Sequence, residues 1–200
     1  MKCDIILTGV GGQGVLLMAE LLGISALIEG LDVRVSEIHG MAQRGGSVLC
    51  HVRLGKKVYA PTIMEGAADI VVGLEPLETL RTIKYMSNKT LVLINIEPIK
   101  PYATTIGLIE YPKIEKILSE IHHKTDSIIT LNALLLAKEA GDTITQNVVM
   151  LGALSATGKL LIKAEAIESA IKKRIPKKFV ELNLRAFRIG FQHTKGIFGE

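Results

Sequence analysis

The sequence has no tryptophan, few aromatic residues and only two cysteines, and these shortages exclude several kinds of site. Aromatic residues make up 4% of the 200 residues, so a core must be built from Ile, Leu, Val and Ala. An iron–sulfur cluster usually needs four cysteine thiolates, and structural zinc needs four closely spaced Cys or His residues. Cys3, Cys50 and the five histidines match neither requirement. We therefore expect this chain to hold no metal.

Long apolar runs and a dense charge of one sign are also missing. No run reaches the roughly 20 residues that span a bilayer, and Met1 leads into a strand-like segment without the features of a signal peptide. Two distant thiols suit buried side chains in a reducing compartment. We expect no membrane contact and a cytoplasmic location.

The net charge of +4 is concentrated late in the chain. The basic residues alternate there with apolar ones at helical spacing, which favours the solvated face of helices over a nucleic-acid-binding stripe. We expect no nucleic-acid partner. The residues are Lys172, Lys173, Arg174, Lys177, Lys178, Arg185, Arg188 and Lys195.

Short apolar runs that end near glycine or asparagine indicate the strands of a sheet. Residues 4–9, 69–74 and 90–95 are apolar on both faces, as in the central strands of a parallel sheet. Residues 32–38 alternate and suit a strand nearer an edge. Residues 46–54 and 57–60 predict a β-hairpin around Gly55-Lys56, so we expect a mixed sheet.

Segments with helical periodicity and helix boundary signals fill the spaces between the strands. Gly30 is expected to end the first helix, and Thr145 is expected to cap a later one. The pattern predicts an α/β fold: one Rossmann-like domain over residues 1–200, with three layers, a doubly wound mixed sheet and a helical C-terminal segment. The predicted helices cover residues 15–29, 76–86, 113–122, 132–140, 146–157 and 163–174, and a last one opens at Pro176.

A glycine-rich loop joins the first strand to the first helix. Gly9 to Gly14 fits the G-x-G-x-x-G pattern, in which glycines allow close approach of an anion to backbone N–H groups at a helix N-terminus. Glu37 lies where an acidic residue would meet a ribose hydroxyl. The candidate binding residues are Gly11, Gly12, Gln13 and Gly14. A tight turn that holds no ligand is the alternative.

A second polar loop, His39 to Gly46, follows the second strand. In a doubly wound sheet this loop and the glycine loop converge on one crevice, with Glu75 as a possible third wall. Gln43 and Arg44 are further candidates, because an arginine between glycines can clamp a phosphate or carboxylate bidentately. A salt bridge between Arg44 and Glu37 is the alternative. No nucleophile–base arrangement stands out, so we predict no catalytic residue.

These two loops together resemble the gamma-type subunit or domain of 2-oxoacid:ferredoxin oxidoreductases. The similarity extends through Glu75 to Glu78 and Asn147 to Leu154 and reaches Lys177 to Asn183. Within that family it is greatest to the small subunit of the enzymes that act on indolepyruvate. Ala42 stands where the family pattern has serine.

The resemblance implies oxidative decarboxylation of an aryl-2-oxoacid to an acyl-CoA, with reduction of ferredoxin and CoA as co-substrate. It places thiamine diphosphate, Mg and the iron–sulfur clusters in a large alpha subunit, and ferredoxin would meet this chain only through the complex. This chain would then bind no catalytic cofactor and be inactive alone. Gln13, Gln43 and Arg44 would face the partner or the CoA phosphates.

Two other interpretations remain open at this point. One is a stand-alone NAD- or FAD-binding protein that uses the glycine loop and Glu37. The other is a structural scaffold with an empty crevice. A subunit separated from an obligate partner should expose an apolar patch along the late helices or around Met41 and Tyr59, and so form homo-oligomers when isolated.

Overall fold

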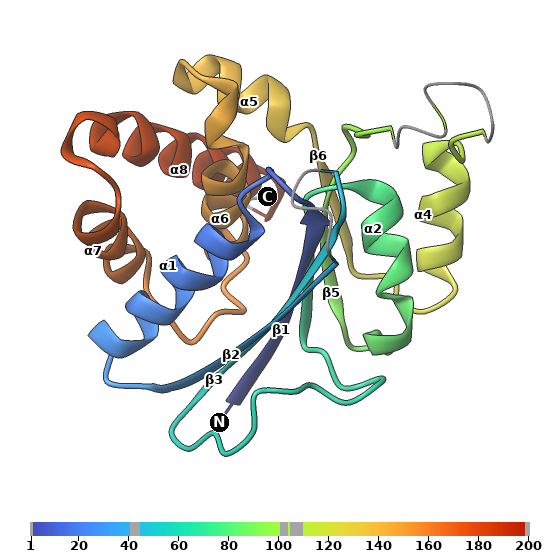
Figure 1. Cartoon of the computed structure of the whole chain (residues 1–200), viewed down its shortest axis with the longest axis horizontal. Helices are drawn as coiled ribbons and strands as arrows, with labels where there is room; N and C mark the ends of the chain where they lie inside the picture. Colours follow the sequence, from blue (N-terminus) through green and yellow to red (C-terminus); the bar gives the residue numbers. More distant parts are fainter. Residues whose placement is uncertain (1, 41–44, 101–103, 105–109, 199–200) are drawn as a thin grey trace.

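A computed structural model of the chain describes residues 2–40, 45–100, 104 and 110–198. It has three layers, with a sheet between two groups of helices (Figure 1). The predicted α/β class, with a mixed sheet and a helical C-terminal segment, is confirmed.

The sheet has six strands in the order β2-β3-β1-β4-β5-β6. β1, β4, β5 and β6 run parallel to one another, whereas β3 is antiparallel to both β1 and β2. β4 and β5 are buried along their whole length, as their apolar runs predict, and β2 forms an edge, as its alternation predicts. The strands are β1 (Lys2–Val10), β2 (Asp32–His39), β3 (Ser47–Gly55), β4 (Ile70–Gly73), β5 (Leu91–Asn95) and β6 (Ile128–Leu131).

The predicted hairpin around Gly55-Lys56 is wrong. β3 instead folds back on β2 and inserts between β2 and β1, with Val52 beside both Val35 and Ile5. Side chains of the sheet satisfy the backbone of the segment that follows. Asp32 accepts a hydrogen bond from the Val58 N–H, and the Arg53 guanidinium donates to carbonyls of this segment. These groups therefore need no strand partner.

The helices follow the predicted segments closely. The helix predicted to reach residue 86 stops earlier and continues as a 3-10 turn, η1 (Ile83–Tyr85). Thr145 does not cap α6, because its hydroxyl donates to the Asp142 carbonyl inside a second 3-10 turn, η2 (Thr143–Thr145). The α-helices are α1 (Val15–Ile28), α2 (Pro76–Arg81), α4 (Ile114–His122), α5 (Ala133–Ala140), α6 (Gln146–Ala156), α7 (Ala164–Arg174) and α8 (Lys177–Phe198).

Two apolar cores lie on opposite faces of the sheet. The larger packs one face of the sheet against α1, α5, α6, α7 and α8, and the smaller packs the other face against the region of α2 and α4. Alternation along β1 divides its side chains between the two, with Ile5 and Leu7 in the larger core and Ile6 in the smaller. Both cysteines are free and buried, and burial raises the pKa of each thiol to about 12.

α6 and α8 cross at two glycines, where their backbones touch. A Cβ on Gly152 would lie 2.0 Å from the Phe187 carbonyl oxygen, and one on Gly190 would lie 2.0 Å from the Val149 carbonyl oxygen. No larger residue fits at either position without separating the helices. Phe187, the largest fully buried side chain, seals this contact, so the predicted apolar face of the last helix is confirmed.

Candidate functional site at the glycine loop

The glycine loop connects β1 to α1 at the carboxyl edge of the sheet. Gly12 and Gly14 have φ values of 103° and 80°, which side chains other than glycine rarely adopt. The loop is fastened to the start of β3, because the Gly11 N–H donates to the Gly46 carbonyl and the Gly45 N–H donates to the Gly11 carbonyl. The predicted strand–loop–helix context of the motif is therefore present.

Within the described part of the chain, no side chain caps the N-terminus of α1. Gly14 is the N-cap residue, and the first turn carries no acidic residue. The first N–H groups of a helix have no partner within the helix and lie at the positive end of its dipole. This end of α1 can therefore receive an anion or the carbonyl groups of a partner.

Two polar side chains hold the loop from behind. The Gln13 amide accepts a hydrogen bond from the Val10 N–H at 2.9 Å and donates one to the Leu74 carbonyl at 2.8 Å. The Asn147 amide, at the start of α6, donates to the Gly14 carbonyl at 3.2 Å. The loop is thereby tied to both β4 and α6, and both ends of the Gln13 amide already have partners within the chain.

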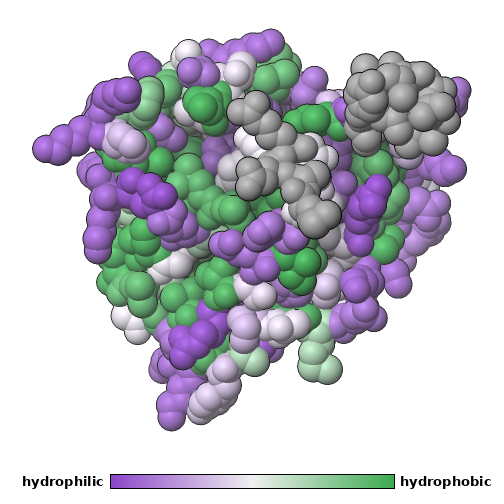
Figure 2. Space-filling model, viewed as in Figure 1, coloured by the Kyte–Doolittle hydropathy of each residue, from purple (hydrophilic) through white to green (hydrophobic). Residues whose placement is uncertain are grey.

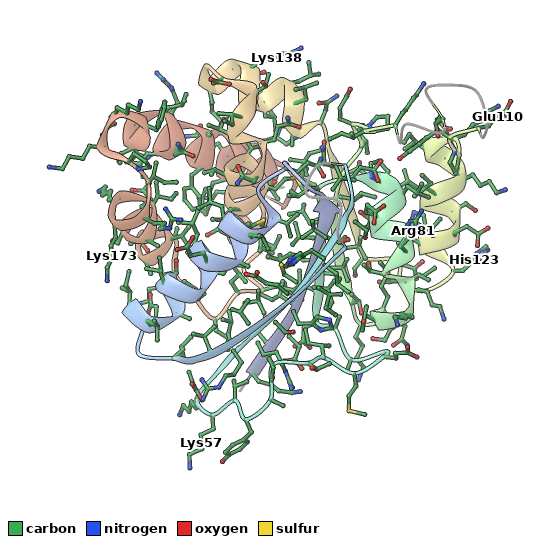
Figure 3. All side chains as sticks on the ribbon, viewed as in Figure 1. Lys57, Arg81, Glu110, His123, Lys138 and Lys173 are labelled. Carbon is green, nitrogen blue, oxygen red and sulfur yellow. The ribbon has the colours of Figure 1, made fainter. Side chains whose placement is uncertain are left out.

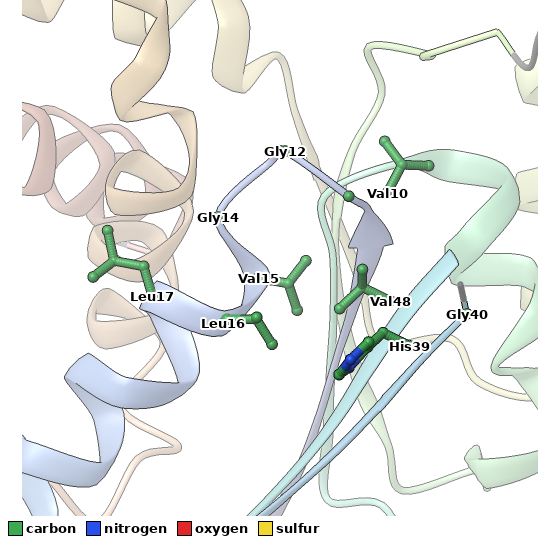
Figure 4. Close-up of a pocket in the computed structure, with 10 residues that line it drawn as sticks. Val10, Gly12, Gly14, Val15, Leu16, Leu17, His39, Gly40 and Val48 are labelled. Carbon is green, nitrogen blue, oxygen red and sulfur yellow. The ribbon is translucent and has the colours of Figure 1, made fainter. Parts of the chain in front are cut away.

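Three hollows surround the start of α1. The largest, about 510 Å³, separates the Val15 and Leu16 side chains from His39 and Val48, with the glycine backbone at its rim (Figure 4). We call it the apolar hollow. A more polar hollow of about 210 Å³ lies on the other side of the loop, where Asn95 and Gln146 join Gln13. The third, about 150 Å³, is lined by Leu17, Ile144 and Phe179.

The predicted binding residues meet at this edge only in part. Gly11 and Gly12 line the two larger hollows, Gly14 and His39 line the apolar one, and Gln13 lines the polar one. Gln43 and Arg44 lie outside the described residues. Whether the candidate residues bind a ligand stays a prediction.

Glu75 does not form the third wall. Glu75 is 1% exposed, and its carboxylate caps α2 by accepting a hydrogen bond from the Glu78 N–H at 2.8 Å. The Tyr111 hydroxyl donates to it at 2.5 Å, and the Ile99 N–H donates at 3.4 Å. Burial raises the pKa of Glu75 and outweighs these hydrogen bonds, which lower it. Glu75 therefore organises the fold beside the site.

The sheet order places Glu37 farther from the glycine loop than a dinucleotide fingerprint requires. In that fingerprint the acidic residue ends the strand next to the first one. Here β3 occupies that position, and Glu37 lies one strand further out, opposite Cys50. At a spacing of about 4.8 Å per strand, the backbone of β2 at Glu37 lies about 10 Å from the axis of β1. This position disfavours the ribose contact of the stand-alone alternative.

Several supporting residues were missed in the sequence. Ser47 donates to the Glu78 carboxylate at 2.5 Å, and Arg81 lies 3.4 Å from the same carboxylate. Glu75-Pro76-Leu77-Glu78 does carry a signal, because an acceptor, a proline at the first helical position and a Glu three residues after the acceptor mark a helix start. Asn147 has no local signal, since it acts on Gly14 across 133 residues.

Comparison with known proteins identifies the family of the chain. Residues 4–193 match the family model described as pyruvate ferredoxin/flavodoxin oxidoreductase. The chain belongs to this family. Relatives of nearly equal length within it include the indolepyruvate oxidoreductase subunit IorB of Pyrococcus horikoshii, 42% identical over 96% of both chains. The protein of the same name from Archaeoglobus fulgidus is 41% identical over 97% of this chain and 96% of its own.

Solved structures of the oxidoreductase family share the fold. The gamma subunit of the keto/oxoacid ferredoxin oxidoreductase from Geobacter sulfurreducens superimposes with a TM-score of 0.69 at 25% identity, covering 97% of this chain and 99% of that one. The 2-oxoglutarate:ferredoxin oxidoreductase from Magnetococcus marinus gives 0.74 at 18% identity, covering 98% of this chain and 31% of that one. In that protein the same fold occupies part of a longer polypeptide.

No helix in the part of the chain that the structure describes is long and apolar enough to cross a membrane. Within the same residues, no group of three or more His, Cys, Asp or Glu side chains is arranged to hold a metal ion.

Proposed function

We propose that this chain is the small subunit of a cytoplasmic 2-oxoacid:ferredoxin oxidoreductase that acts on indolepyruvate or a related arylpyruvate. The reaction joins one 2-oxoacid anion and one CoA to give acyl-CoA, CO₂ and one proton, and the two electrons released reduce two ferredoxins by one electron each. The observation that carries this proposal is the identity of about two residues in five, over nearly full length, with relatives named indolepyruvate oxidoreductase subunit.

The catalytic cofactors belong to a large alpha subunit in this proposal. The two cysteines of the chain are too few for a cluster, and both are buried, with thiol pKa values near 12 that disfavour the thiolate a metal would need. Thiamine diphosphate, when bound in the alpha subunit, supplies the carbanion chemistry of decarboxylation. The small chain contributes a structural surface and no redox group.

In this proposal, the glycine loop is the part of the chain that contacts CoA or the alpha subunit. Its open N–H groups suit the phosphates of CoA or carbonyl groups of the alpha subunit. Arg44 would add a guanidinium clamp beside them. Replacing Arg44 with Ala in the reconstituted complex should raise the KM for CoA or weaken assembly. Unchanged assembly, KM and turnover would remove Arg44 from the site.

The decisive experiment is to purify the tagged chain from its native host and to assay it with indolepyruvate, CoA and ferredoxin. We expect a brown complex with a large cysteine-rich subunit, active only when both chains are present. A lone colourless chain that binds NAD without any partner would overturn the proposal in favour of a stand-alone dinucleotide-binding protein.

A further inference from the structure

The exposed apolar residues concentrate around α1. This helix is apolar on all sides, as in helices that are buried. Its one charged side chain before the C-cap, Glu20, is occupied by an ion pair with Arg174 of α7. Figure 2 shows apolar side chains gathered over this helix on the face turned to the viewer. Leu16 is 42% exposed and Leu27 66% exposed on it.

The first turn of α1 forms a ridge between two of the hollows. Leu16 points into the apolar hollow toward His39 (Figure 4), and Leu17, which points away from His39, lines both this hollow and the third one. Leu17 lines the third hollow together with Ile144, 76% exposed, and Phe179, 44% exposed. We call this continuous surface, with Val48 at its other end, the apolar band. It runs past the rim of the glycine loop.

One end of the apolar band carries an excess of basic side chains. Between residues 172 and 181 five basic residues and one acidic residue are exposed, and one of the five, Arg174, is paired with Glu20. Lys173 points outward from α7 at this corner (Figure 3). The Lys178 ammonium lies 4.8 Å from the centre of the Phe179 ring. We call residues 172–181 the basic corner.

We infer that the apolar band is the docking surface for the alpha subunit, which would insert apolar side chains on both sides of the Leu16–Leu17 ridge and place acidic residues against the basic corner. This inference rests on the proposed function. Obligate interfaces are as apolar as a protein core that has been divided between two chains. A helix with apolar residues on all sides, such as α1, is suited to burial in such an interface. A second copy would bring a surface of the same net charge, which favours a different chain.

The existence of a longer relative supports a large partner. In the Magnetococcus marinus protein the same fold is 31% of a single chain, so a fold of this kind is compatible with a much larger body packed against it. Docking on the apolar band would cover the glycine loop. Its N–H groups would then be enclosed between the two subunits and shielded from water, where an anion is bound more strongly.

The test replaces Leu16 with Glu in the full chain, co-expressed with its alpha subunit. An acidic residue in the first turn of a helix is favourable, so the variant should fold as well as the wild type. We expect at least a tenfold loss of the alpha subunit in the co-purified complex and a matching loss of activity. Circular dichroism of the isolated variant checks its folding.

The matched control is Leu135→Glu. Leu135 lies in the first turn of α5, is 54% exposed and lines none of the three hollows. This variant should keep wild-type complex yield. A Lys177→Glu, Lys178→Glu double variant should weaken the complex mainly at low salt, because salt already screens the ion pairs of the wild type.

The outcomes separate the two proposals. If the wild type binds the alpha subunit and L16E binds it equally well, or if L135E fails equally, the docking surface is refuted and the proposed function stands. If the wild type binds no alpha subunit, both are refuted. If the isolated wild type is a dimer that L16E dissociates, while the complex with the alpha subunit is unaffected, the band joins two copies of this chain and the inference is wrong.

Discussion

Two helices begin at the carboxyl edge of the sheet, on its opposite faces, and their first turns are built in opposite ways. α2 follows β4, and its N-terminus is closed by the chain itself: Glu75 caps it, and Tyr111 and Ile99 donate to the same carboxylate. α1 follows β1, which pairs directly with β4, but it begins at Gly14, and no side chain among the described residues caps it. The N-terminus of α2 serves the fold, and that of α1 is the one we propose to receive a group from outside the chain.

The largest effect should come from removing the cap of α2. Glu75→Ala leaves the buried Glu78 N–H and Tyr111 O–H without their acceptor, at a cost of about 3 kcal/mol in the free energy of unfolding. Urea unfolding of the isolated chain measures it. Glu75→Gln keeps an oxygen for the cap and should lose about 1 kcal/mol. Equal losses in the two variants would show that the negative charge of Glu75, and not its role as a hydrogen-bond acceptor, stabilises the N-terminus of α2.

Gly14→Ala tests whether the N-cap position of α1 tolerates a side chain. The new Cβ would lie 2.3 Å from the Asn147 amide nitrogen, at a φ of 80°, and we expect a loss of about 2–3 kcal/mol. Gly12→Ala is the control, because nothing lies within 4 Å of its Cβ. It should lose only about 1–2 kcal/mol, from backbone strain alone. Thermal unfolding of both variants measures the difference. Equal losses of stability would show that the contact between Gly14 and Asn147 contributes nothing beyond backbone strain.

Gln13→Ala asks whether the glycine loop needs its support from β4. The change removes two hydrogen bonds and should lower the free energy of unfolding by about 1–2 kcal/mol. Gln146→Ala removes one exposed hydrogen bond, to the Thr143 carbonyl, and should cost less than about 0.5 kcal/mol. Urea unfolding measures both losses. If Gln13→Ala lost as little free energy of unfolding as Gln146→Ala, the two hydrogen bonds of Gln13 would not stabilise the fold, and a role in ligand binding would be favoured.

The smallest expected effect is a pH dependence that belongs to α2 alone. Burial raises the pKa of Glu75 above its ordinary value of 4.5. At a pH between the unfolded and the folded pKa, the folded chain therefore keeps a proton on Glu75 that the unfolded chain has already released. Stability should therefore fall as pH rises through the folded pKa. Comparing wild type with Glu75→Gln between pH 4 and 7 isolates this slope, since shifts at other carboxyls such as Asp4 cancel. Parallel pH curves would contradict it.

The sequence predicted most elements of the fold because they depend on local signals. The apolar runs of β4 and β5 and the glycines after α1 and α5 act within a few residues. The pairing of β3 failed because it depends on contacts far along the chain, with β1 and with the Asp32 carboxylate. β6 was missed because its four residues show only a weak pattern.

The candidate site was also predictable where it depends on local signals and not where it depends on distant contacts. The glycine loop has a motif, and its place at the carboxyl edge followed from the alternation of strands and helices. Glu75 was misplaced because its burial depends on Tyr111, 36 residues away. An exposed apolar patch was expected along the late helices, and Phe179 of α8 is exposed there. The rest of the apolar band could not be predicted, because Ile144 and Phe179 meet Leu17 only after α8 has packed on α6.

The glycine crossing of α6 and α8 makes the docking surface stiff. Touching backbones at Gly152 and Gly190 leave α8 no room to slide or roll along α6, and the Asn147 amide carries this constraint to the loop at Gly14. The basic corner at the start of α8 and the ridge on α1 thus move as one piece. A partner that meets one of them finds the other already at the correct distance, so little conformational entropy is lost when the two chains associate.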